Sequence, residues 1–150
     1  MEWVILLIIN WALFLLLVDW KALKVNIWGG VFTVCMQIFV DTQFIAHNLY
    51  AFHNQIICIF GSSLLFEIGP VFVIGVLFTQ YHPVKKWAII INLAVVCTLF
   101  TFIEYFLVKR NVLEYINWHM IDSIGVNIAA IGLLSWVCIV VFDKRRDRDS

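Results

Sequence analysis

The sequence predicts an all-α fold: a polytopic integral membrane protein built as a bundle of five transmembrane helices. Hydrophobic residues make up 63% of the 150-residue chain, charged residues make up 13%, and the mean hydropathy is +0.97. Soluble domains carry about 25% charged residues, and a small fold leaves too much surface exposed to hide this apolar excess. Lipid must therefore cover part of the surface, so the lipid bilayer is the first predicted partner.

Five apolar runs separated by short polar segments define the predicted spans. They lie at residues 3–18, 25–40, 56–79, 87–108 and 116–142. A helix that crosses a bilayer needs about 20 apolar residues, so the first two runs are slightly short. No internal repeat or long linker divides the chain, and residues 1–150 are predicted to form one transmembrane helical domain.

Two segments outside these runs receive their own predictions. Residues 41–54 mix Phe, Leu and Ile with His, Asn and Asp, which is typical of an amphipathic segment lying in the membrane interface. His47 and His53 are six residues apart and would not share a helix face, so a metal pair is not favoured there. Residues 143–150 are highly charged and are predicted to be a disordered cytoplasmic tail.

The distribution of basic residues predicts the orientation. With five spans, the connections near residues 19–24 and 80–86 share one side with the tail, and together they hold eight of the ten Lys and Arg residues. The positive-inside rule places that side in the cytoplasm and the N-terminus outside. The first run has no basic segment before it and no small-residue cleavage site after it, so it is predicted to be a retained helix rather than a signal peptide.

Composition and motifs exclude several functions. The formal net charge is zero, so no basic field would recruit nucleic acid. The four Cys residues lie singly in apolar runs and are predicted to be inert small hydrophobes. No HExxH motif, nucleophile elbow or Gly-rich phosphate loop is present, so no cofactor and no confident metal site is predicted.

Glu67 is the ionisable residue deepest in a predicted span. It lies about 12 residues, or ~18 Å, into the third run, which would place it near the centre of the bilayer. Pro70 follows closely and predicts a kink, because it lacks a backbone donor and crowds the preceding turn. Glu67 is then either a neutral group bonded to a freed carbonyl or a proton- or ion-handling residue.

The stretch 101–125 carries the other candidate site. The fourth and fifth runs should form an antiparallel hairpin that brings Glu104, His119 and Asp122 to a similar depth. Helical periodicity puts Cys97, Thr101 and Glu104 on one face of the fourth helix. It puts His119, Asp122, Gly125 and Ala129 on one face of the fifth helix. Both faces are predicted to point inward. Glu104, His119, Asp122 and Thr101 are then either interhelical hydrogen-bonding groups or candidate residues for binding a ligand, lipid headgroup or ion, or for catalysis.

The order of these features resembles a known group of proteins. The features are Asp19-Trp20-Lys21 after the first span, Tyr81-His82-Pro83 at the end of the third, Glu104 late in the fourth, and Trp118 and Ser123 at the start of the fifth. This order is similar to that of small, uncharacterised multi-span membrane proteins of spore-forming Firmicutes. The resemblance implies a location in a bacterial plasma membrane and an accessory role, and it implies no particular activity.

Three classes of function remain open. The leading hypothesis is a non-enzymatic accessory component that packs against a membrane protein partner, or forms a homo-oligomer, through the small residues Gly125, Ala129 and Gly132. The second is a membrane-embedded ligand- or lipid-binding protein or enzyme using the Glu104, His119 and Asp122 set. The third is a small ion or solute carrier in which Glu67 faces a water path, although the chain lacks the repeated halves of conventional carriers.

Overall fold

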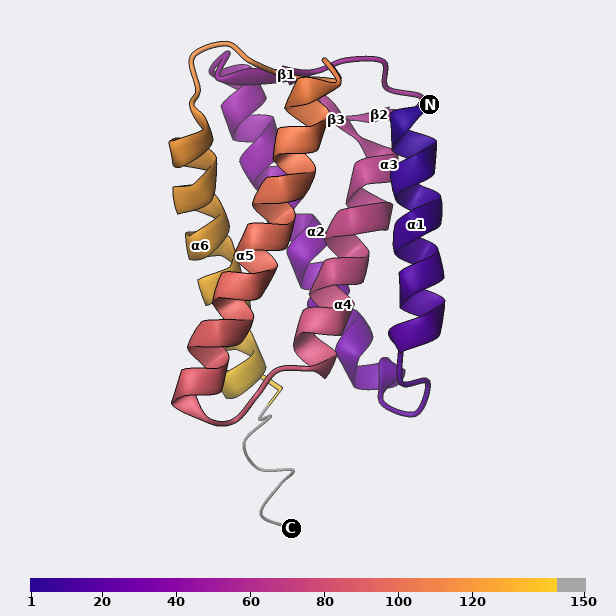
Figure 1. Ribbon diagram of the computed structural model, residues 1–150, viewed down its shortest axis with the longest axis vertical. Coiled ribbons are helices and arrows are strands. Elements are labelled where there is room, and N and C mark those ends of the chain that lie inside the picture. The colour runs from indigo at the N-terminus through magenta and orange to yellow at the C-terminus, as the bar shows by residue number, and fades with distance from the viewer. Residues whose placement is uncertain (143–150) are drawn as a thin grey trace.

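The computed structural model describes residues 1–142 as a helical bundle with short strands at one end (Figure 1). The predicted tail at 143–150 lies outside the described residues. The elements in chain order are α1 (Glu2–Leu17), α2 (Leu23–Ala46), β1 (Tyr50–Phe52), β2 (Cys58–Ile59), β3 (Ser62–Ser63), α3 (Leu64–Phe66), η1 (Glu67–Val71), α4 (Phe72–Gln80), α5 (Lys86–Lys109), β4 (Leu113–Tyr115) and α6 (Met120–Val140). The segments α3, η1 and α4 follow one another without a break and form one helical column.

The helical columns run alternately up and down the bundle (Figure 1). Three helices within residues 1–142 are long and apolar enough to cross a membrane: α2, α5 and α6. The helix α1 and the column Leu64–Gln80 are shorter apolar helices. The mostly helical architecture is therefore confirmed. Four short strands were not predicted, and they join the columns at one end.

Two ends of the bundle can be distinguished. The strands β1 and β4 form an antiparallel pair, and β2 and β3 form a hairpin. Both lie at the same end, which we call the strand end, whereas the connections 18–22 and 81–85 lie at the opposite, loop end (Figure 1). The two basic connections were predicted to lie on the same side of the bundle. This is confirmed for the described residues, because the connections that carry Lys21 and Lys85 both lie at the loop end. Lys109 and Arg110 lie at the strand end.

The second predicted span, residues 25–40, ends too early, because the first part of the segment 41–54 continues the helix. Helix α2 continues through Asp41 to Ala46, and only then do a turn and strand β1 follow. Asp41 does not end the helix because its carboxylate is buried and accepts hydrogen bonds from Gln37 Nε2 (2.8 Å) and from the Tyr50 hydroxyl. An acidic side chain with internal donors can remain in an apolar helix, because its cost of leaving water is partly offset.

The predicted irregularity near Pro70 is confirmed. Residues Glu67–Val71 adopt a π-helical turn that includes Pro70, flanked by the α-helical segments α3 and α4. Proline removes one backbone donor, and π-helical geometry occurs in proteins mostly as single turns inside α-helices. The neighbouring helix α1 supplies a donor here, because Trp11 Nε1 hydrogen-bonds to the Ile68 carbonyl at 3.1 Å.

Glycines bring α2 and α4 into close contact in the half of the bundle near the loop end. A Cβ atom built on Gly29 would lie 1.9 Å from Thr79 Oγ1, and one built on Gly75 would lie 2.5 Å from Thr33 Oγ1. The two threonine hydroxyls hydrogen-bond to carbonyls of their own helices, those of Gly75 and Gly29 respectively. Small residues at such crossings allow the helix backbones to approach closely.

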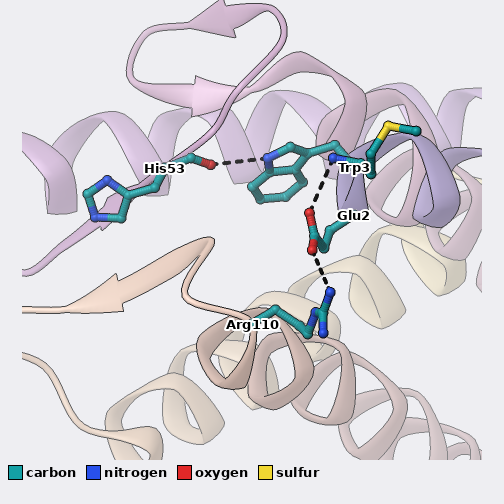
Figure 2. Close-up of polar contacts among 5 residues, drawn as sticks. Glu2, Trp3, His53 and Arg110 are labelled. Atoms are coloured by element: carbon teal, nitrogen blue, oxygen red, sulfur yellow. Dashed lines mark hydrogen bonds and ion pairs between the residues drawn. The ribbon is translucent and has the colours of Figure 1, made fainter.

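The strand end is closed by aromatic residues. Trp3 is fully buried beside Phe52 and Phe66, and its Nε1 donates to the His53 carbonyl at 3.2 Å. Figure 2 shows this contact and, next to it, the ion pair between Glu2 and Arg110 at 2.8 Å. These contacts tie the first helix to the strands and to the end of α5.

Candidate functional site

The most buried acidic groups of residues 1–142 lie together near the strand end. Asp41 comes from α2 and is 1% exposed, whereas Glu67 comes from the first residue of η1 and is 0% exposed. The two carboxyl groups lie within hydrogen-bonding reach of each other, and both reach Ser62. Ser62 Oγ donates to Glu67 Oε1 at 3.0 Å. Three elements therefore converge on one pair of carboxyl groups.

Each carboxyl group in this pair has one oxygen with a donor and one without. Asp41 Oδ1 accepts hydrogen bonds from Gln37 and Tyr50, and Glu67 Oε1 accepts from Ser62. Asp41 Oδ2 and Glu67 Oε2 are buried and have no hydrogen-bond partner. Buried polar atoms of native proteins are normally satisfied, so two such oxygens in one small region require a physical account.

Tyr50 is the donor supplied by the strand end. Burial raises the pKa of the Tyr50 phenol above its usual range, and the neighbouring Asp41 carboxyl raises it further. The phenol therefore keeps its proton and acts as a hydrogen-bond donor to Asp41. The side chain is held by aromatic contacts with Phe44, Phe52 and Trp118.

A third carboxyl group, Glu104 of α5, is bound by α6. Asn127 Nδ2 donates to Glu104 Oε2 at 2.9 Å and lies 3.5 Å from Thr101 Oγ1. Ser123 also lies within hydrogen-bonding reach of Glu104. The predicted inward face of the fourth helix is confirmed, because Cys97 is buried and Thr101 and Glu104 both contact α6.

A small polar cavity separates the Glu104 group from the Asp41 group. Its volume is about 20 Å³, which is sufficient for one water molecule. It is lined by Gln37, Val40, Phe44, Tyr50, Glu104, Trp118, Ser123, Val126 and Asn127. Gln37 and Tyr50 also bind Asp41, so the cavity connects the surroundings of the two acidic groups.

His119 and Asp122 do not join Glu104 in the predicted cluster. Their side chains are 84% and 44% exposed, and His119 Nδ1 lies 3.4 Å from Asp122 Oδ2. The Asp122 carboxylate accepts the backbone N–H of His119 at 3.0 Å, and the two residues form a capping box at the start of α6. A carboxylate in this position satisfies free backbone donors and complements the helix dipole.

The predicted inward face of the last helix was also wrong. Asp122, Gly125 and Ala129 are exposed on α6, whereas Ser123, Asn127 and Ser135 are buried. The three buried residues are spaced by four or eight positions and form a polar face toward the bundle. The prediction failed because a polar side chain at the start of a helix does not have to point into the bundle. Asp122 instead accepts a backbone N–H group at the helix terminus.

The predicted depth of Glu67 needs the same kind of correction. The third run does not begin as a helix at residue 56, because residues 55–63 form the β2–β3 hairpin and its connections, and the helical column starts at Leu64. Glu67 therefore lies about 5 Å along the column, near the strand end rather than at the middle. Its partners are Ser62 and Asp41, not a backbone carbonyl freed by Pro70.

No family model, curated protein or solved structure matches the chain.

The types of side chain present limit the chemistry that the site can perform. Within residues 1–142, no group of three or more His, Cys, Asp or Glu side chains is placed to hold a metal ion. Cys35 and Cys58 are exposed, whereas Cys97 and Cys138 are buried, and the Cys138 thiol donates to Thr79 Oγ1 at 3.6 Å. The arrangement offers carboxyl groups, which can bind and release protons, and hydroxyl and amide groups, which can form hydrogen bonds.

Several site residues were not predicted from the sequence, among them Asp41, Tyr50 and Ser62. Asp41 was assigned to a polar segment, although Gln37 and Asp41 are four residues apart and would share a face if the helix continued. Extending the second run to residue 46 would have revealed an acidic residue inside an apolar helix. The pairing of Tyr50 with Asp41 depends on the turn at residues 47–49 and has no comparable signal.

Proposed function

We propose that the chain is a five-crossing integral membrane protein that acts as a non-enzymatic accessory component of a bacterial plasma membrane. The observation that carries this proposal is the distribution of side chains. The described interior holds Asn26, Asp41, Glu67 and Asn127, whereas Ile, Leu, Val, Phe and Trp residues dominate the exposed faces of the helices. Soluble domains seldom expose apolar surface of this extent, whereas lipid covers it without cost.

The helix lengths support five crossings. The three long helices have 24, 24 and 21 residues, or about 36, 36 and 32 Å of helix. The two shorter apolar columns, Glu2–Leu17 and Leu64–Gln80, run beside them along the same axis (Figure 1). A shorter helix crosses the membrane when local thinning of the bilayer or flanking interfacial residues compensate for its length.

The basic residues support an orientation with the loop end in the cytoplasm. Lys21, Lys24, Lys85 and Lys86 belong to the loop end, whereas the strand end carries Lys109 and Arg110. The positive-inside rule then places the N-terminus and the strands outside. The bacterial plasma membrane is proposed from the resemblance to multi-span proteins of spore-forming Firmicutes.

The exposed face of α6 supports contact with another transmembrane helix. A Cβ built on Gly125 or Gly132 meets no atom within 4 Å, so packing within the chain does not require glycine there. Ala129 continues this face. Beside it, a groove of about 650 Å³ between α5 and α6 is lined almost entirely by apolar side chains, including Leu93 and Ile128. Small residues on a lipid-facing helix favour close helix association.

Reporter fusions test the topology directly. A reporter active only outside the cytoplasm should be active after Asn48, at the strand end, and inactive after Pro83, at the loop end. A cytoplasmic reporter should show the opposite pattern, also at Ser150. If Asn48 and Pro83 report the same compartment, the column Leu64–Gln80 does not cross the membrane and the five-crossing proposal is wrong.

Photo-cross-linking tests the proposed helix contact. A photo-reactive amino acid at position 129 should form a discrete cross-linked product with a second copy or with one membrane protein. The matched control places it at Val95, which is exposed on α5. Gly132→Leu should reduce the product from position 129 without unfolding the protein. Only lipid adducts from position 129, equal to those from position 95, would contradict the accessory role.

A further inference from the structure

We propose that Asp41 and Glu67 form a proton-binding site in which the two carboxyl groups share a single proton. This inference goes beyond the accessory role and does not depend on the identity of a partner. It rests on the contact between two fully buried carboxyl groups and on the two oxygens, Asp41 Oδ2 and Glu67 Oε2, that have no donor.

The contact itself requires a proton. Two ionised carboxylates are both acceptors, so they cannot hydrogen-bond to each other, and their like charges repel in a poorly solvated place. A proton on one group turns the contact into an O–H···O⁻ hydrogen bond, which is short and strong because one partner is charged. The remaining negative charge is stabilised by donors from Gln37, Tyr50 and Ser62.

The surrounding elements provide no cation that could replace the proton. The titratable groups facing the pair are the Tyr50 phenol from β1 and the Glu104 carboxyl from α5. Helix α1 faces η1 with Leu7 and Trp11, and the nearby polar groups of α6 belong to Ser123 and Asn127. Among the described residues, no Lys, Arg or His is a hydrogen-bonding partner of either carboxyl group.

The proton also links the site to stability. The folded protein holds a proton that the unfolded chain would release at neutral pH, so the folded state binds more protons. Stability must then fall as pH rises through the range in which the pair loses its proton. Because the pair joins α2 to the column Leu64–Gln80 and to Tyr50, loss of the proton would loosen these contacts at the strand end.

Infrared difference spectroscopy of the protein in lipid vesicles tests the proposal. A protonated carboxylic acid has a carbonyl stretching band that is separate from the bands of carboxylates and amides. The wild-type protein should show such a band at pH 7 and lose it at alkaline pH. Asp41→Asn and Glu67→Gln should each remove the same band, because either amide supplies the missing donor and leaves the other carboxyl ionised.

Two controls separate this site from its surroundings. Glu104→Gln removes the third buried carboxyl group and should leave the band of the pair unchanged. The double variant Asp41→Asn with Glu67→Gln should lose no more carboxylic acid signal than either single variant. Exchange of choline chloride for sodium chloride should not change the wild-type band at pH 7.

Three results would overturn the proposal. Separate bands, each removed by only one of the two substitutions, would mean two independently protonated groups. A band that disappears when sodium chloride replaces choline chloride would assign the site to a cation. Absence of any band at pH 7 that depends on Asp41 or Glu67 would leave no shared proton. If neither single variant folds, the Glu104→Gln protein decides, because it keeps the pair and must still show the pH-dependent band.

These results are distinguishable from failure of the proposed function. The shared proton concerns the interior at the strand end, whereas the topology fusions and the cross-linking concern the connections and the outer face of α6. A shared proton with no helix contact at position 129 would keep this inference and remove the accessory role.

Discussion

The two ends of the bundle are held together in different ways. Toward the loop end, α2 and α4 meet through Gly29, Gly30 and Gly75, and a methyl group at any of these positions would overlap a neighbouring atom. Toward the strand end, the columns separate enough to hold three carboxyl groups, a phenol and a small cavity. The contact of α2 with α4 depends on close backbone packing, whereas the strand end holds a network of buried polar groups.

This difference indicates where function can be located. Close backbone packing tolerates almost no change in volume. A buried polar network, by contrast, changes its energy when one proton enters or leaves. The buried carboxyl groups therefore make the strand end a region able to respond to a change in protonation. The loop end also contains a buried polar pair, His82 Nε2 and Ser135 Oγ, at 2.8 Å.

The largest expected effect is a steric one at Gly75. Gly75→Ala places a Cβ 2.9 Å from the Gly30 Cα, and no side-chain rotation can relieve an overlap with backbone. Overpacking of this kind costs about 1–3 kcal/mol, and we expect the upper part of that range because two helices must separate. Unfolding in mixed detergent micelles, followed by circular dichroism, measures the loss.

The matched control for Gly75 is Gly132→Ala on α6. An added Cβ at Gly132 meets no atom within 4 Å, and alanine favours helix more than glycine does. Its free energy of unfolding should be equal to or higher than that of the wild type. Equal losses at positions 75 and 132 would show that the loop end is not held together by close packing.

The next effect concerns the hydrogen bond between Tyr50 and Asp41 at the strand end. Tyr50→Phe keeps the aromatic contacts but removes one donor from a buried carboxyl group, which should cost about 1–3 kcal/mol. Tyr81→Phe is the control at the loop end, because its hydroxyl donates to the Leu17 carbonyl in an exposed position. Chemical unfolding should show a clearly smaller loss for Tyr81→Phe. The reverse order would contradict the importance assigned to the strand end.

Sequence reasoning could predict the helical columns better than the contacts between them. The apolar runs, the irregularity at Pro70 and the inward face of α5 follow from hydrophobicity, proline chemistry and helical periodicity, which are local properties. The Asp41–Glu67 contact joins residues 26 positions apart through a hairpin whose strands are only two residues long. Such short strands carry too little alternation to be recognised, so the start of the third column and the depth of Glu67 were misplaced.

A titration of Tyr115 tests whether the Glu104 carboxyl acts on a neighbouring phenol at the strand end. Burial raises the pKa of Tyr115 to about 12, and the Glu104 carboxyl contributes to the same shift. The folded protein therefore keeps this phenol proton between pH 10 and 12, and the associated stability is lost as pH rises through the folded pKa. Ultraviolet absorbance of phenolate should show the late titration, and Glu104→Gln should bring it to lower pH. An unchanged titration in that variant would mean that Glu104 does not act on Tyr115.

The smallest expected effect is the coupling between Glu104 and His119. Glu104 binds Asn127 in the interior, whereas His119 and Asp122 cap the exposed start of α6, so the two groups share no hydrogen bond. Independent groups have additive effects on stability within about 0.5 kcal/mol, and Glu104→Gln with His119→Gln should behave in this way. The cycle of Glu104→Gln with Asn127→Ala is the positive control, because removal of either partner breaks the same bond. A larger coupling for the His119 cycle than for the Asn127 cycle would restore a single outward site made of Glu104, His119 and Asp122.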